Sequence, residues 1–120
     1  MKSMIVVLGH GSRAAEHNQG LMQVVEMVRS KTDLPVTAAF MENCRPNVDT
    51  VIRGAAAEGY QRFIVMPLFL FRGIHVQQDV PKEIVDIKRD LPELEVIFTG
   101  HLGPDPKIAE IVWDRVREVI

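Results

Sequence analysis

Three of the four histidines in the sequence stand in polar segments that follow apolar runs. His10 lies between two glycines in the segment G-H-G-S-R at 9–13, and His75 lies in the segment 72–79, beyond a longer apolar run. Imidazole titrates near neutral pH and is the commonest protein ligand for late first-row metal ions. These two side chains could therefore present a divalent metal ion or accept protons.

Glu42 could join the two histidines in a sparse, open metal site. The sequence contains no H-E-x-x-H motif and no paired C-x-x-C, so a closed structural zinc site is not expected. Spacing alone also fits histidines that only cap a turn or bond to a backbone carbonyl. At this level, metal handling and a structural role both remain open for His10 and His75.

Cationic and aromatic side chains occupy the same polar segments. Arg13, Arg45 and Arg72 each follow a different apolar run, and guanidinium groups pair well with carboxylate or phosphate. Their convergence would favour an anionic ligand, although solvated loop charge explains any one of them equally well. Phe69 and Phe71 approach the His75 segment and could line an apolar pocket or pack in the core.

The segment 9–14 also matches the loose dinucleotide pattern G-x-G-x-x-A. The acidic residue expected about 20 positions later is missing at that spacing. A simpler phosphate or carboxylate site at a helix N-terminus is the better interpretation of this glycine pattern. A phosphate-handling or nucleotide-binding α/β protein therefore remains one alternative.

Four short apolar runs predict the strands that position these residues. Runs without alternation suit strands buried on both faces of a mainly parallel sheet. Pro67 lacks an amide donor, so we expect the third strand to be irregular near its end. The runs are Met4–Leu8, Val36–Met41, Phe63–Leu70 and Val96–Thr99.

Apolar residues recur at helical spacing over 21–28, 48–56, 80–91 and 108–119. Strands and helices therefore alternate four times, which predicts an α/β fold: a single four-stranded, mainly parallel sheet with helices on both faces. Ligands of such sheets bind beyond the carboxyl ends of the strands, where the polar segments fall. His17 is the one histidine expected within a helix.

Length and composition limit the function further. The chain has 120 residues, which predicts one domain over 1–120. A net charge of −2 excludes a broadly basic nucleic-acid binder. The apolar runs are far shorter than the roughly 20 residues that span a bilayer. Cys44 is the single cysteine and cannot form an internal disulfide, so a cytoplasmic location is expected.

Several of these segments together resemble one family. They are L-G-H-G-S-R at 8–13, F-M-E at 40–42 followed by Pro46, P-L-F-L-F-R-G-I-H-V at 67–76, and L-G-P-D-P at 102–106. The chain resembles the small, half-length class II sirohydrochlorin cobaltochelatase and ferrochelatase family along essentially its whole length. The resemblance implies a metal chelatase of the lyase class, which inserts a divalent metal into a tetrapyrrole for cobalamin or sirohaem.

The resemblance also implies roles for the candidate residues. His10 and His75 match the paired metal-handling histidines, and Glu42 matches an acidic position. The metal is a substrate, with Co²⁺ the first choice and Fe²⁺ or Ni²⁺ open, and no prosthetic group is implied. Longer members look like two such domains in tandem, which implies a homodimer here. A non-catalytic tetrapyrrole or metal carrier is the second alternative.

Overall fold

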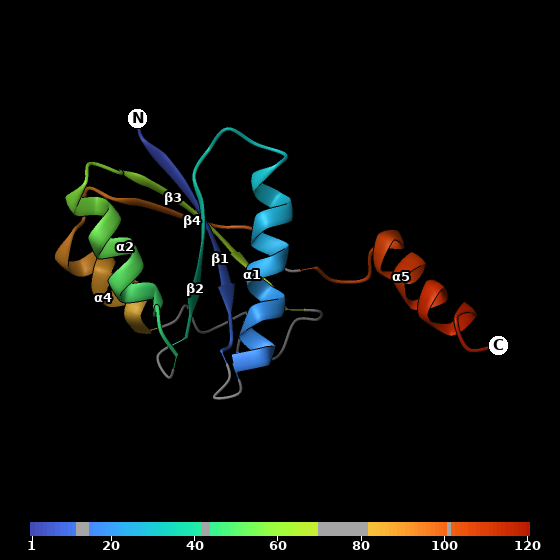
Figure 1. The fold of residues 1–120 in the computed structure, drawn as a ribbon. Helices are drawn as coiled ribbons and strands as arrows, with labels where there is room; N and C mark the ends of the chain where they lie inside the picture. Colours follow the sequence, from blue (N-terminus) through green and yellow to red (C-terminus); the bar gives the residue numbers. More distant parts are fainter. Residues whose placement is uncertain (12–14, 42–43, 70–81, 101) are drawn as a thin grey trace.

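A single parallel sheet forms the centre of the molecule (Figure 1). The computed structural model describes residues 1–11, 15–41, 44–69, 82–100 and 102–120, and for 15–17 the backbone only. The strands lie in the order β2-β1-β3-β4, and every pair is parallel. They are β1 (Ser3–Gly9), β2 (Val36–Phe40), β3 (Arg62–Pro67) and β4 (Glu95–Phe98).

Helices cover both faces of this sheet, which confirms the predicted fold class. The helix α1 (Ala15–Arg29) packs on one face, and α2 (Val48–Ala57) and α4 (Lys82–Asp90) pack on the other (Figure 1). The helix α5 (Pro106–Arg117) stands away from the sheet. None of the helices in the described ranges is long and apolar enough to span a membrane.

The central strand β1 is apolar on both sides because both of its sides are covered. Val6 and Leu8 belong to the cluster beneath α2 and α4, whereas Val7 belongs to the cluster beneath α1. All three are almost completely buried. Side chains alternate between the two faces of a strand, so a strand between two helical layers needs an unbroken apolar run.

The larger cluster joins β1, β3 and β4 to α2 and α4. Phe63 from β3, Ile52 from α2, and Ile84 and Ile87 from α4 are fully buried in it. Burial of each such side chain contributes about 1.5–3 kcal/mol, so this face holds most of the core free energy. The sheet edge that carries the polar segments is built on this rigid layer.

The third strand ends earlier than the apolar run suggests. Its last residue is Pro67, whereas the run extends to Leu70, which lies outside the described residues. Proline has no amide hydrogen for the sheet ladder, and the Phe69 amide donates to the Pro67 carbonyl at 3.0 Å. The expected irregularity at Pro67 is therefore confirmed, and it turns the chain out of the sheet.

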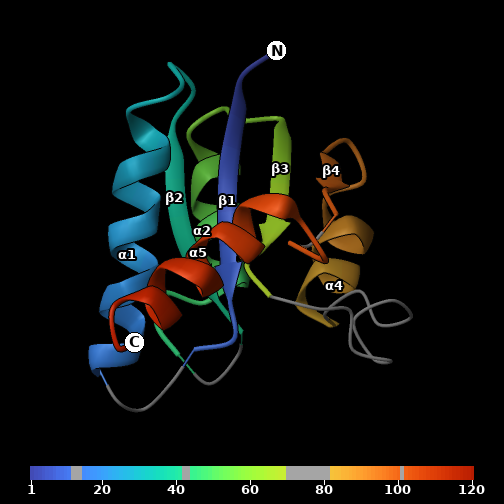
Figure 2. The same ribbon diagram turned by 90° about the vertical axis from the view of Figure 1, so that its right-hand side faces the viewer.

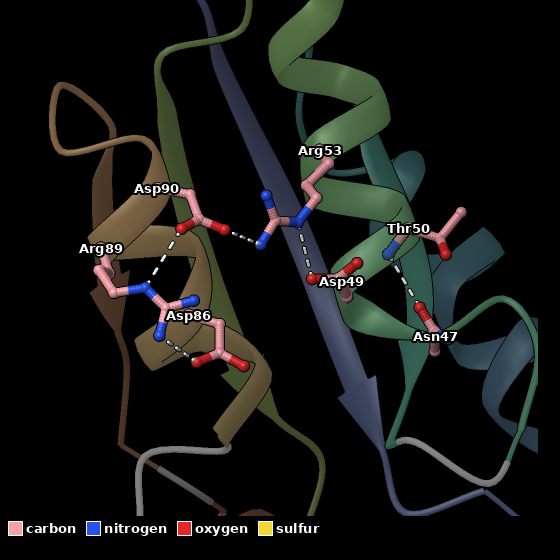
Figure 3. A network of polar contacts seen from close by, with 7 residues as sticks. All are labelled: Asn47, Asp49, Thr50, Arg53, Asp86, Arg89 and Asp90. Atoms are coloured by element: carbon pink, nitrogen blue, oxygen red, sulfur yellow. Dashed lines mark hydrogen bonds and ion pairs between the residues drawn. The ribbon is translucent and has the colours of Figure 1, made fainter.

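A polar network connects α2 to α4 on the outer surface (Figure 3). The Arg53 guanidinium donates to Asp49 at 2.8 Å and to Asp90 at 2.9 Å, and Arg89 donates to Asp90 at 3.2 Å. The hydrogen bond from Arg53, followed by that from Arg89, lowers the pKa of the Asp90 carboxyl below its ordinary value. This network links two helices of the same layer on their outer surface.

The lowered pKa of Asp90 makes this network sensitive to acid. A carboxyl with a lowered pKa in the folded state adds stability above its ordinary pKa of 3.8, and that stability disappears as the pH falls through the folded-state pKa. We expect Asp90→Asn to lower the free energy of unfolding at pH 7, with a smaller loss at strongly acidic pH. Urea unfolding of the parent and the variant at pH 7 and at strongly acidic pH measures the loss of unfolding free energy at each pH. Equal losses at the two pH values would contradict the account.

Candidate functional site

The neighbouring positions of β1 and β3 bring two polar loops together at the carboxyl edge of the sheet. Leu8 is paired with Pro67 in the parallel register, and the Leu68 amide donates to the Leu8 carbonyl at 2.8 Å. Beyond this hydrogen bond, β1 continues to His10 and β3 continues to Phe69. The two residues lie side by side because their strands end at the same level.

His10 stacks on Phe69 across this edge. Their ring centroids are 3.9 Å apart and the ring planes are inclined by 20°. His10 is exposed, and Phe69 is half-buried. A stacked phenyl ring covers one face of the imidazole but leaves the ring nitrogens, whose bonding directions lie in the ring plane, open to a ligand. Phe69, predicted as a substrate contact, thus supports His10 in this structure.

The glycines around His10 allow the chain to pass close to its neighbours. Gly11 has a positive φ of 83°, and a Cβ at that position would fall 2.6 Å from the Cβ of Cys44. The Asn18 side-chain amide contacts the Cys44 sulfur at 3.7 Å. A glycine at position 11 therefore lets the turn after His10 pass close to Cys44 of the second loop.

An open cavity of about 400 Å³ lies beside His10. Its wall consists of the β1 turn, the inner part of α1, the end of β2 and the start of the third loop. This volume falls within the range of about 300–1,000 Å³ for small-molecule sites, and the cavity is open to solvent. Sequence periodicity did not single it out. Its lining residues are Gly9, His10, Gly11, Asn18, Gly20, Leu21, Val24, Phe40 and Leu68.

The other loops reach the same edge. The Met41 amide donates to the Gly9 carbonyl at 3.1 Å, and the Leu102 amide donates to the Phe69 carbonyl at 3.2 Å. Arg45 follows β2 in the second of these loops and is exposed. The described parts of all four loops therefore gather where ligands of parallel sheets bind.

Several predicted site residues lie outside the described part of the chain: Arg13, Glu42, Phe71, Arg72 and His75. Among the described residues, no three His, Cys, Asp or Glu side chains gather closely enough to hold a metal ion. The described side chains thus supply one imidazole at this edge, and its pairing with His75 stays a prediction.

The fold and the site define a small parallel α/β domain that presents a histidine on a glycine turn, beside an open cavity at the carboxyl edge. Residues 4–119 match the family model CbiX. The chain belongs to the CbiX family.

Curated relatives of two lengths are similar to this chain. The sirohydrochlorin cobaltochelatase of Methanopyrus kandleri is 32% identical over 137 residues, covering 97% of this chain and 96% of the relative. The sirohydrochlorin cobaltochelatase of Methanothermobacter thermautotrophicus is 31% identical, and the match covers 97% of this chain and 92% of that relative. The sirohydrochlorin ferrochelatase of Bacillus subtilis is 27% identical, and the match covers 99% of this chain but 46% of that longer relative.

Solved structures show the same two lengths. A putative cobalamin biosynthesis CbiX protein from Marinobacter aquaeolei has a TM-score of 0.81 and 28% identity, with 97% of this chain and 95% of that chain covered. The sirohydrochlorin chelatase SirB from Bacillus subtilis, in complex with cobalt, has a TM-score of 0.88 and 26% identity. The match covers 99% of this chain but 51% of SirB.

The close approach at Gly11 predicts the cost of a side chain there. Gly11→Ala places a Cβ in a left-handed conformation and against Cys44, so we expect a loss of roughly 1–3 kcal/mol in the free energy of unfolding. Gly54→Ala in α2 is the matched control, because its Cβ meets nothing within 4 Å, and should stabilise by about 0.5–1 kcal/mol. Urea unfolding compares the two, and a Gly11→Ala protein as stable as the parent would refute the packing argument.

Proposed function

We propose that this chain is a sirohydrochlorin chelatase, which inserts a divalent metal ion into the sirohydrochlorin ring. The observation that carries the proposal is His10, held on Phe69 beside an open cavity, in a chain that matches sirohydrochlorin cobaltochelatases from end to end. Family membership supports the reaction, and the geometry supports His10 as the group that acts in it.

The chemistry of insertion suits a weak ligand set. The protein must strip water from the ion and then release the ion to the ring, so one or two imidazoles are better than a closed cage of four ligands. Two pyrrole protons must also leave the ring. A neutral imidazole can accept one, and positioned proton transfer contributes typically about 10²–10⁴-fold. We assign both tasks to His10 together with His75.

The remaining predicted residues fit the rest of the substrate. The exposed Arg45 is suited to a peripheral carboxylate of the ring, and we assign the same role to Arg13 and Arg72. Glu42 would assist proton removal or the binding of the metal ion. Phe71 would contact the ring face. Phe69 acts indirectly, by holding the imidazole of His10.

Cobalt is the metal that we propose first. The archaeal relatives of similar length are named cobaltochelatases, while relatives of about twice the length from Bacillus subtilis and Priestia megaterium are named ferrochelatases. Histidine and carboxylate ligands accept Co²⁺, Fe²⁺ and Ni²⁺, so the residues themselves do not select among them. The ion is a substrate of the reaction, and we place the reaction in the cytoplasm.

We also propose that two copies act together as a homodimer. SirB is about twice as long as this chain, and its fold over one half matches the whole of it. A wide planar macrocycle needs walls on both sides, and the cavity beside His10 is open. A second copy would supply the missing wall.

The role of His10 is tested by metal insertion into sirohydrochlorin. With Co²⁺ supplied, we expect His10→Ala to reduce the insertion rate at least about 100-fold, because both metal presentation and proton acceptance are lost. Lys31→Ala, an exposed change just beyond the far end of α1, is the control and should retain the parent rate. The absorption change of the ring measures both rates.

Two results would overturn the proposal. An inserted amount that stops at one equivalent of ring per protein would indicate a carrier instead of an enzyme. A His10→Ala protein that inserts cobalt at nearly the parent rate would remove this histidine from the mechanism.

A further inference from the structure

The turn that carries His10 rests on side chains on the face of the sheet that α1 covers. A Cβ added at Gly11 would fall 2.6 Å from the Cβ and 2.8 Å from the Sγ of Cys44, and 3.4 Å from the Cβ of Phe40. Phe40 is buried in the cluster beneath α1, and Cys44 packs against that cluster. The backbone directly after His10 is therefore in close contact with Cys44.

Two contacts from different strands act on this turn. The His10 ring stacks on Phe69 at the end of β3, and the next residue, Gly11, packs on Cys44 beyond the end of β2. His10 is exposed, so burial does not restrain its ring. A displaced Cys44 side chain would move Gly11 and, through one peptide link, the base of the imidazole side chain.

The Cys44 side chain is itself held by Asn18 of α1. The Asn18 amide nitrogen lies 3.7 Å from the Cys44 sulfur, a weak acceptor, and the contact is partly buried. The Cys44 backbone has its own contact, since its amide donates to the Met41 carbonyl at 3.1 Å. The first turn of α1 lies at the level where β1 ends, which brings Asn18 to the second loop (Figures 1 and 2).

Asn18 is a polar side chain in a largely apolar wall. The other described residues that line the cavity beside His10 are glycine or apolar, His10 excepted. Asn18 is half-buried, and burial of an amide costs free energy unless the amide is hydrogen-bonded. Polar groups in such walls are therefore few and specifically placed. Here the amide is directed at the sulfur on which the His10 turn packs.

We propose that Asn18 is a positioning residue for His10 and that it acts through Cys44. The contacts run from the Asn18 amide to the Cys44 sulfur, from Cys44 to Gly11, and from Gly11 to the adjoining histidine. They tie α1, the second loop and the β1 turn together beside the cavity. The inference rests on the proposed function for the role of His10. It adds the residue that keeps the imidazole in place, and small displacements of a reacting group are costly in rate.

Metal insertion into sirohydrochlorin tests the pair as a double-mutant cycle. We expect Asn18→Ala and Cys44→Ala each to lower kcat roughly 3–10-fold, about the effect of one hydrogen bond, with the KM for the ring unchanged. Because both act through one contact, the double variant should lose no more than the larger single loss. Gln19→Ala, at an exposed neighbour of Asn18 outside the cavity wall, is the control and should keep the parent kcat.

Three results of this cycle would overturn the positioning role. Losses that multiply in the double variant would mean that Asn18 and Cys44 act independently. A raised KM for Asn18→Ala, with Cys44→Ala at the parent values, would mean that Asn18 contacts the ring itself. Parent kcat in both single variants would mean that the contact does not serve the reaction.

The position of the imidazole can also be measured without metal or substrate. His10 lies over the Phe69 ring, whose ring current moves the NMR signals of the imidazole C–H protons upfield. His10→Gln identifies these signals, and Phe69→Leu gives their unstacked positions. We expect Asn18→Ala and Cys44→Ala to move the signals toward the unstacked positions by similar amounts, and Gln19→Ala to leave them in place. Signals that stay unmoved in either of the first two variants would refute the coupling.

The two proposals fail separately. Imidazole signals that move as expected, in a chain that inserts no metal, would refute the chelatase activity and leave the positioning role standing. A chain that inserts cobalt, while Asn18→Ala and Cys44→Ala keep the parent signals and the parent kcat, would do the reverse.

Discussion

The parallel pairing of β1 with β3 is the constraint on which the site depends. The last hydrogen bond of this pair, from the Leu68 amide to the Leu8 carbonyl, fixes the level at which both strands leave the sheet. Because the bond holds the strands at the same level, His10 and Phe69 emerge as neighbours and stack. A slip of one residue would turn every side chain of β3 to the opposite face and separate the two rings. The buried layer of Phe63, Ile52 and Ile84 holds this register.

Most of the fold follows from the sequence because its signals agree with one another. Continuous apolar runs predicted buried parallel strands, and helical spacing between them predicted the connections. Gly59, with a φ of 102°, follows α2 as expected of a glycine beyond a helix end. The position of α5 could not be predicted, since periodicity identifies an apolar side but not the surface it covers.

The candidate site was predicted in part. The glycine turn and the rule for parallel sheets placed His10 at the carboxyl edge, where it lies. Phe69 was expected to meet a substrate, and its contact with His10 depends on strand adjacency, which no local pattern encodes. The cavity between α1 and Leu68 likewise joins residues far apart in sequence. Solved structures of two chain lengths share this unit.

The central claim is that the imidazole of His10 presents the metal ion at the carboxyl edge of the sheet. The most direct test is anomalous diffraction at the cobalt absorption edge, from crystals of the chain grown with Co²⁺. The account predicts a cobalt peak at metal–nitrogen bonding distance from the His10 imidazole, with His75 as the second ligand. A cobalt ion bound elsewhere on the protein, with the His10 ring uncoordinated, would contradict it.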